Sequence, residues 1–269
     1  MNAARLIGPV VAAALVGLVG IGWCFTIDAL SYVAVLASLF AMDVPREPVR
    51  VRKSHVLAEL VEGLAYVRNE PMVRAVLLLL AVTSMLGGSY SALLPAVAEV
   101  SLHGGHYALG CLMASGGAGA LAGALYLASR ADVSGLPDLI ARCGLGIGGG
   151  LLALELAPSV WVAAPLLFVV GLSLMIQWGA TNTLVQTVVD DDKLGRVMSL
   201  YAVAFFAGAP VGALIEGSLA SWLGPIHAYA FAGAGCLLSS LLFRWSLRGL
   251  RAVPRPRYLE LGLVEAPEP

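Results

Sequence analysis

The chain has 269 residues, of which 59% are hydrophobic and 12% are charged, and its formal net charge is −1. Soluble domains carry roughly a quarter charged residues, so this composition excludes a water-soluble globule. Apolar runs of about 18 residues or more recur from end to end, and each is long enough to cross ~30 Å of hydrocarbon. The 31 glycines and 14 prolines suit packed membrane helices better than a barrel. We therefore predict an all-α membrane protein that is surrounded by a lipid bilayer and binds no nucleic acid.

Eight apolar segments are predicted to span the membrane. In chain order they cover residues 6–22, 24–42, 75–98, 107–129, 139–157, 160–184, 197–219 and 227–245. The only long hydrophilic interval follows the second span. Within it Val56, Leu57, Leu60, Val61, Leu64 and Val67 recur at helical spacing. This pattern predicts an amphipathic helix on the membrane surface, which Pro71 ends.

Positive charge lies on one side of this predicted topology. All 16 lysines and arginines fall in alternate loops, at the span ends next to those loops, or at the adjoining termini, and the opposite loops have none. The positive-inside rule places the basic loops in the cytoplasm. Because the number of spans is even, both termini are also expected there, in a multi-pass protein of the cytoplasmic (inner) membrane.

A weak internal repeat links the first and seventh predicted spans. The first carries Gly8, Pro9 and Gly17, and the seventh carries Pro210 and Gly212 in a similar run of small residues. The two spans lie six apart and run in the same direction, as in carriers built from duplicated six-helix units. We therefore expect four regions. They are the last two spans of an incomplete N-terminal bundle (1–42), a cytoplasmic linker (43–72), a six-span bundle (73–248) and a disordered tail (249–269).

Several stretches carry a family resemblance. They are residues 2–9 (NAARLIGP), 23–25 (WCF), 28–32 (DALSY), 62–67 (EGLAYV), 93–95 (LLP), and Gln186 with residues 194–201 (LGRVMSLY). Together they resemble the major facilitator superfamily, and most closely its bacterial enterobactin-exporter-like branch. The resemblance begins at the fifth span of that family, so the first four spans have no counterpart here. The family's Gly-rich basic loop is reduced to residues 129–132.

The resemblance implies a secondary active transporter that exports drug-like or siderophore-like small molecules by alternating access. It also implies an antiporter with the proton as coupling ion. The sequence contains no phosphate-cradling loop with its lysine, no nucleophile elbow and no zinc-protease helix motif, so neither a cofactor nor enzymatic activity is expected. A carrier needs two bundles around its central site, so we expect the 269-residue chain alone to transport poorly. The alternative is a non-transporting partner or scaffold that assembles with itself or with another membrane protein through its small-residue faces.

Asp28 in the second span and Glu216 in the seventh are the acidic residues placed most clearly within predicted spans. An ionisable group inside the membrane is costly, which makes it a functional candidate. Both are candidates for proton coupling. The alternative is that each lies near the outer end of its helix, where water relieves the cost.

The sixth predicted span carries an unusually polar set for a segment that faces lipid. Gln177, Trp178, Thr181 and Asn182 are expected to face a cavity, together with Tyr90 of the third span. Contact with substrate and hydrogen bonding between helices are the two interpretations, and for Gln186 we favour hydrogen bonding.

The remaining candidates are structural. Gly8, Pro9, Gly17, Pro210 and Gly212 match hinges or close packing faces. Arg196, which follows three aspartates and Lys193, is a candidate for a gating ion pair, with a solvated turn as the alternative. His103 and His106 have no further ligand beside them, so no metal site is predicted.

Overall fold

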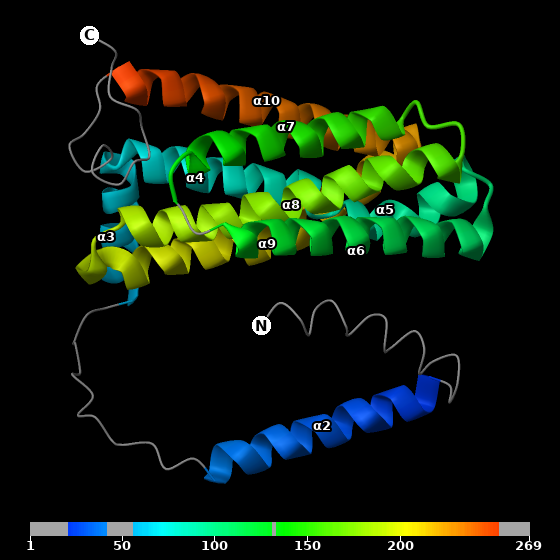
Figure 1. Cartoon of the computed structure of the whole chain (residues 1–269), viewed down its shortest axis with the longest axis horizontal. Coiled ribbons are helices and arrows are strands. Elements are labelled where there is room, and N and C mark those ends of the chain that lie inside the picture. Colours follow the sequence, from blue (N-terminus) through cyan, green and yellow to red (C-terminus); the bar gives the residue numbers. More distant parts are fainter. Residues whose placement is uncertain (1–20, 42–55, 131–132, 253–269) are drawn as a thin grey trace. The chain divides into compact units, whose positions relative to one another are not determined.

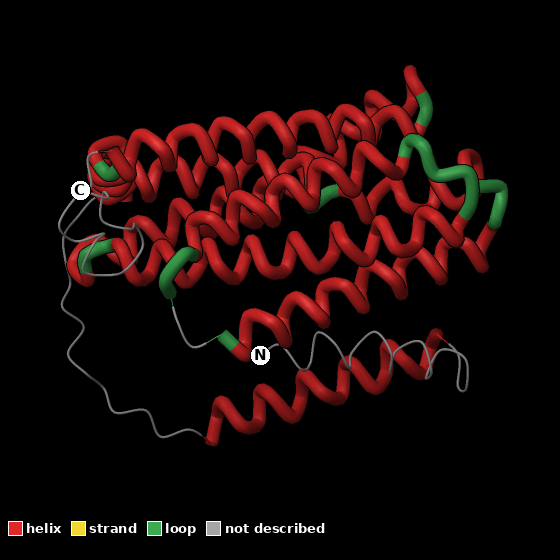
Figure 2. Tube along the Cα trace, turned by 45° about the horizontal axis from the view of Figure 1, so that its top comes forward, coloured by secondary structure: helices red, strands yellow, loops and turns green. Residues whose placement is uncertain are grey.

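The computed structural model of the protein describes residues 21–41, 56–130 and 133–252. Every regular element among these residues is a helix (Figure 2), so the predicted all-α membrane protein is confirmed. The chain divides into two compact units, Met1–Ser54 and His55–Pro269. Each unit is described by itself.

In the first unit, helix α2 runs over Ile21–Ala41. Its described side chains are exposed, including the large apolar Phe40 at 89% and Leu30 at 63%. This helix occupies the second predicted span. The first predicted span lies outside the described residues, apart from its last two.

The second unit begins with α3 (Val56–Asn69) and then crosses the bundle through a helix of mixed type. That crossing consists of α4 (Pro71–Val82), the π-helix η1 (Thr83–Gly87), α5 (Tyr90–Ala96) and the π-helix η2 (Val97–Ser101). Five long helices follow. They are α6 (Gly105–Ser129), α7 (Leu136–Leu154), α8 (Val160–Val188), α9 (Asp191–Leu223) and α10 (Pro225–Ala252).

Six helices of the described chain are long and apolar enough to cross a membrane: residues 71–101 and α6 to α10. They run side by side in Figure 1, and α3 lies at the end where α4 begins and α8 meets α9. The described lysines and arginines gather near this same end, where α6 also ends and α7 begins. The helices extend beyond the predicted apolar segments: α9 spans Asp191–Leu223, whereas 197–219 was predicted.

Pro71 separates α3 from α4. Glu70 is extended, with φ −100° and ψ 96°, and Pro71 is the first residue of α4. A proline disfavours helical geometry in the residue before it and suits the first helical position, because its missing N–H would have no partner there. The same residue therefore ends the predicted amphipathic helix and starts the first span of the bundle.

The two π-helices arise where side chains and a proline weaken the regular helical ladder. The Thr83 hydroxyl donates to the Leu79 carbonyl at 2.8 Å, and Ser89 lies 2.7 Å from the Met85 carbonyl. Such bonds from a side chain back to the preceding turn bend helices. Pro95 lacks a backbone donor just before η2. The first crossing is therefore irregular in its middle, at η1, and again at its C-terminal end, at η2.

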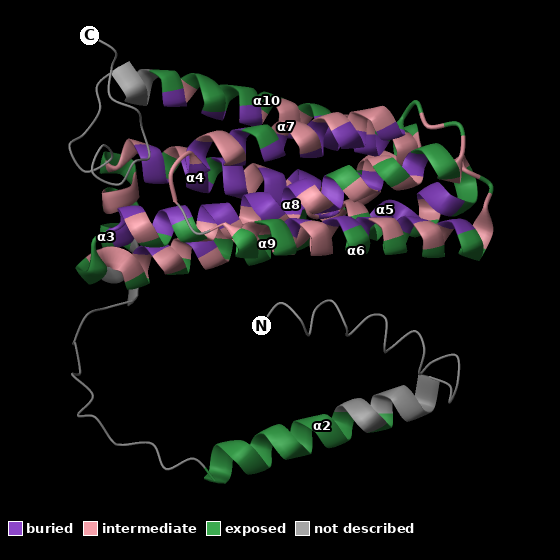
Figure 3. Cartoon of the chain, viewed as in Figure 1, coloured by how far each residue is buried: buried purple, intermediate pink, exposed green. Residues whose placement is uncertain are grey.

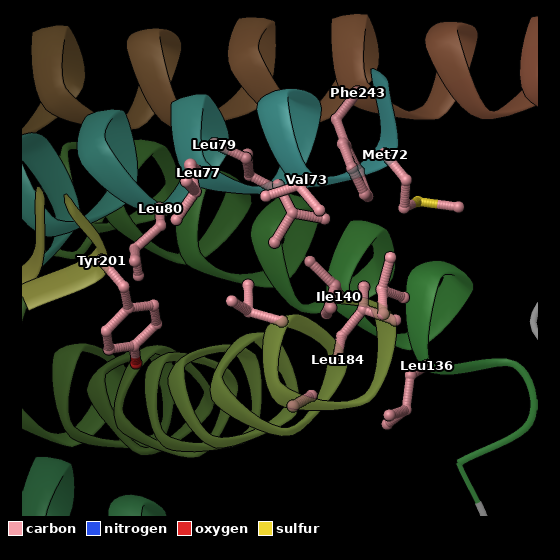
Figure 4. Close-up of a cluster of buried hydrophobic side chains, with 14 of the residues drawn as sticks. Met72, Val73, Leu77, Leu79, Leu80, Leu136, Ile140, Leu184, Tyr201 and Phe243 are labelled. Carbon is pink, nitrogen blue, oxygen red and sulfur yellow. The ribbon is translucent and has the colours of Figure 1, made fainter. Parts of the chain in front are cut away.

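Buried apolar side chains form two clusters, one toward each end of the bundle. Figure 4 shows the first, in which Met72, Val73 and Phe243 lie near Ile140 and Leu184. The second includes Leu112, Ile147, Leu167 and Tyr229. Figure 3 shows these buried faces alternating with exposed faces along the same helices, as expected where lipid surrounds a packed bundle.

Glycines allow a close helix crossing between α6 and α8. A Cβ atom on Gly119 would collide with the Phe168 carbonyl, and one on Gly171 would collide with the Gly116 carbonyl. Backbone therefore lies against backbone at this crossing. In membranes, where lipid removes most of the hydrophobic drive between helices, such close contact is a main source of association.

Candidate functional site

Helix α9 rests directly on the π-helix η1. A Cβ atom on Gly208 would lie 2.9 Å from the Cβ of Ser84, and one on Gly212 would collide with the Met85 carbonyl. Gly212 is buried, whereas Pro210 between these glycines is exposed. Two glycines one helical turn apart thus bring α9 against an irregular, polar part of the first crossing. π-helical turns are frequent at functional sites.

Glu216 lies one turn further along α9, and its side chain is fully buried. It is seven residues before the helix ends at Leu223, which corresponds to about 10 Å along the axis. Its Oε1 lies 2.6 Å from the Ser89 hydroxyl, which also lies 2.7 Å from the Met85 carbonyl. A hydroxyl has one proton to donate, so it serves one of these acceptors at a time.

Several buried polar atoms around this contact have no hydrogen-bond partner among the described residues. They are Ser84 Oγ, Trp178 Nε1, Glu216 Oε2 and both amide atoms of Gln177. An unpaired buried polar atom costs about 1–3 kcal/mol, and each one therefore requires an explanation. Three of these residues, Ser84, Trp178 and Glu216, border the η1–α9 contact.

Trp178 belongs to this contact through an aromatic cluster. Its ring meets Phe205 edge to face, with centroids 4.9 Å apart, and Phe205 stacks on Tyr201 at 6.1 Å. The Tyr201 hydroxyl donates to the Trp178 carbonyl at 3.3 Å. A Cβ atom on Gly88 would lie 3.2 Å from the Trp178 ring, which places the ring beside the end of η1.

Gln177 lies on a different face of α8 from Trp178, and Thr181 follows it one helical turn later. Gln177 and Thr181 are both buried, and the Gln177 amide points toward small residues of α7 and α10, because a Cβ atom on Gly144 would approach both Gln177 Nε2 and Ser240 Oγ. These two residues therefore face the interior of the bundle. Gln177 and Trp178 therefore do not face one common surface.

The remaining predicted polar residues are Asn182, Gln186 and Tyr90. Gln186 Nε2 donates to Asn182 Oδ1 at 2.6 Å, a bond within α8 rather than between helices. Tyr90 turns its hydroxyl toward Gly116 of α6. Its carbonyl accepts a hydrogen bond of 2.5 Å from the Tyr229 hydroxyl.

Arg196 pairs with a carboxylate of α3. Glu62 Oε1 lies 2.6 Å from Arg196 Nη1 and 2.7 Å from Lys193 Nζ. The Tyr66 hydroxyl donates to Asp190 Oδ2 at 3.3 Å, and burial raises the pKa of this phenol, so it keeps its proton. These contacts attach α3 to the turn between α8 and α9.

We expect Glu62→Gln to loosen α3 by about 1 kcal/mol, because two partly exposed ion pairs lose their shared acceptor charge. The measurement is hydrogen exchange of the α3 amides, which should quicken roughly fivefold. Asp192→Asn is the matched control, since it removes one charge from the same turn while the α3 contacts remain. Equal effects of the two changes would show that net charge, and not the pairing with Glu62, holds the helix.

Some predicted residues cannot be placed. Gly8, Pro9 and Gly17 lie outside the described residues, and the side chain of Asp28 does too, although its backbone is part of α2. Their roles stay predictions.

Ser84, Ser89 and Glu62 were not among the predicted site residues. A signal for the two serines was available, because Thr83, Ser84 and Ser89 form a polar group within an otherwise apolar span. No local signal existed for Glu62, whose partner Arg196 is 134 positions away.

The described residues hold no group of three or more His, Cys, Asp or Glu side chains that could bind a metal. A helical membrane bundle with a buried carboxyl and unpaired polar atoms where two of its helices meet is typical of a membrane transport protein. The chain belongs to the transmembrane secretion effectors of the major facilitator superfamily, the family that matches residues 1–256. The resemblance seen in the sequence is thereby confirmed.

Relatives support the same assignment. The chain is 25% identical over 258 residues to the enterobactin exporter EntS of Citrobacter koseri, a match that covers 93% of this chain and 60% of that protein. It is 26% identical over 250 residues to EntS of Escherichia coli O139:H28 and of Shigella boydii serotype 18. Each of these matches covers 91% of this chain and 58% of the relative. The chain thus spans about 60% of the length of the curated relatives it matches.

Proposed function

We propose that the protein is a proton-coupled exporter of small molecules in which Glu216 carries the proton. Residues 73–248 would form one six-span bundle and residues 1–42 the last two spans of the other, joined by the linker 43–72 and followed by the tail 249–269. The basic end of the helices would face the cytoplasm, with both termini on that side of the inner membrane. On this proposal the protein catalyses no chemical reaction.

The observation that carries the proposal is the fully buried Glu216 at the η1–α9 contact. If Oε1 of Glu216 is protonated, it can donate to Ser89, and Ser89 can then donate to Met85, so all three groups are paired. If Glu216 is ionised, Ser89 can donate either to the carboxylate or to the Met85 carbonyl, but not to both. The hydrogen-bond pattern therefore changes with the proton, at the point where two helices touch.

The substrate class rests on the names of the relatives. These are enterobactin exporters, and they support a siderophore-like molecule over an unrelated solute. Trp178 offers an unpaired indole N–H beside an aromatic cluster, which is suitable for a substrate with aromatic rings and hydrogen-bond acceptors.

We further propose that the 269-residue chain transports poorly by itself, because it would contain one bundle and part of a second. In proteoliposomes with an imposed pH gradient, efflux of enterobactin and of ethidium, a drug-like probe, should match that of empty liposomes. Gradient-dependent flux of either probe would overturn the proposed impairment.

A non-transporting partner or scaffold is the competing proposal. The exposed apolar side chains of α2 would serve such assembly, although lipid suits them equally well. Purification in mild detergent separates the two, since a single stable oligomer favours the partner and a heterogeneous species favours an incomplete carrier.

A further inference from the structure

A groove opens between α4 and α10, away from the η1–α9 contact. Its volume is about 480 Å³, and its lining includes Arg74, Leu78 and Val82 of α4 with Ser239, Leu242 and Ser246 of α10. Leu78 and Leu242 form an open rim, since they are 62% and 57% exposed. In a membrane-spanning bundle an apolar groove with an open rim faces the acyl chains of lipids.

The groove runs along the two helices from the basic end of the bundle toward its middle. α4 and α10 are the first and sixth crossings and run in opposite directions, so Arg74 and Ser246 share one end of the groove and Val82 and Ser239 share the other. From Pro71 to Val82 the helix rises about 16 Å. That length matches half the hydrocarbon thickness of a bilayer, the depth that one acyl chain reaches.

Arg74 supplies the charge at the open end. It is exposed, and its Nη1 donates to the Arg68 carbonyl at 3.0 Å, which orients the guanidinium at the corner between α3 and α4. A guanidinium has five N–H donors in a fixed fork that suits phosphate, and this bond uses one of them. Arg244 and Arg248 of α10 are exposed near the same end.

We propose that this groove binds an anionic phospholipid of the bilayer, with its phosphate at Arg74 and one acyl chain along Leu78, Leu242 and Val82. Charge at one end and apolar walls along the rest match an amphiphile with an anionic head. A protein helix is about 10 Å across with its side chains and is too wide for a groove of this volume. A small soluble anion could bind at Arg74 but would not contact the apolar walls along the rest of the groove. The inference does not rest on the proposed transport activity.

The test is native mass spectrometry of the 269-residue chain released from detergent after addition of phosphatidylglycerol or phosphatidylethanolamine with the same acyl chains. The wild type should bind phosphatidylglycerol about fivefold more than phosphatidylethanolamine, as expected for a basic side chain at an anionic lipid surface. Arg74→Gln should remove most of this preference, with the remainder due to Arg244 and Arg248 near the same end. Arg142→Gln, which removes an exposed arginine of α7 outside the groove, should keep the preference.

A second pair of variants tests the acyl-chain part. Leu78→Trp should fill the groove and lower the occupancy of both lipids severalfold. Leu125→Trp on α6 is its control, because Leu125 is also 62% exposed but lies outside the groove. Excess inorganic phosphate should displace nothing. Equal losses in Arg74→Gln and Arg142→Gln, or full occupancy in a folded Leu78→Trp, would overturn the proposal.

Discussion

Replacing Gly119 with alanine is expected to lower the free energy of unfolding by about 2–3 kcal/mol, the upper range for overpacking. The added methyl would collide with the Phe168 carbonyl on α8. A long side chain can change rotamer to make room, but a backbone carbonyl moves only with its helix. The α6–α8 crossing must therefore widen along its length, and Gly171→Ala should act in the same way through the Gly116 carbonyl.

Gly117→Ala provides the matched control. It lies on the same helix, and a Cβ atom there would meet nothing within 4 Å. Alanine is a better helix former than glycine by at most about 1 kcal/mol, so this change should be neutral or stabilising. The measurement is unfolding in mixed micelles with increasing sodium dodecyl sulfate. If the two variants unfold at the same midpoint, the close crossing does not stabilise the bundle.

The helical bundle was predictable because the bilayer imposes a simple rule on sequence. A span needs about 20 apolar residues, and each apolar run here became a helix wherever the structure describes it. Helix ends were less predictable. The first turns of α9 contain Asp191, Asp192 and Lys193, which hydropathy excludes from a span, yet backbone hydrogen bonds continue the helix into the polar region.

The candidate site was only partly predictable. Glu216 stood out because a carboxylate within a span is costly, and it is indeed buried. Gln177 and Trp178 were predicted to face one cavity, but their side chains point in different directions. Successive residues of an α-helix point about 100° apart. Gln177 accordingly faces α7 and α10, whereas Trp178 faces Phe205 of α9.

Local sequence patterns could not predict which distant segments would contact one another. Ser89 meets Glu216 across 127 positions, and this requires both the irregular turn at η1 and the glycines of α9. A π-helix has no sequence signature as strong as an apolar run. The same limit applies to α3, whose helical periodicity was predicted. Arg196 was predicted as a candidate for an ion pair, but its partner Glu62 on α3 was not.

Replacing Glu216 with glutamine is expected to abolish labelling of α9 by dicyclohexylcarbodiimide. This apolar reagent reaches groups inside the membrane and reacts with protonated carboxyls. The wild-type chain should be labelled at Glu216, as measured by peptide mass spectrometry. Glutamine has nearly the same shape, and its amide oxygen can accept from Ser89, so the variant should remain folded while the label is lost.

Glu155→Gln is the control, because Glu155 is an exposed carboxylate beside His227 at the end of α7, and its removal should leave the labelling of Glu216 unchanged. Ser89→Ala should also retain the label, since the carboxyl itself remains. A folded wild-type chain without label would mean that Glu216 does not gain a proton in the apolar phase, and proton coupling through it would fail. Labelling would instead show a carboxyl that holds a proton where α9 rests on η1. Because the Ser89 hydroxyl has one proton, an ionised Glu216 would compete with the Met85 carbonyl for it, so loss of the carboxyl proton would leave one of these two acceptors without Ser89 as a donor.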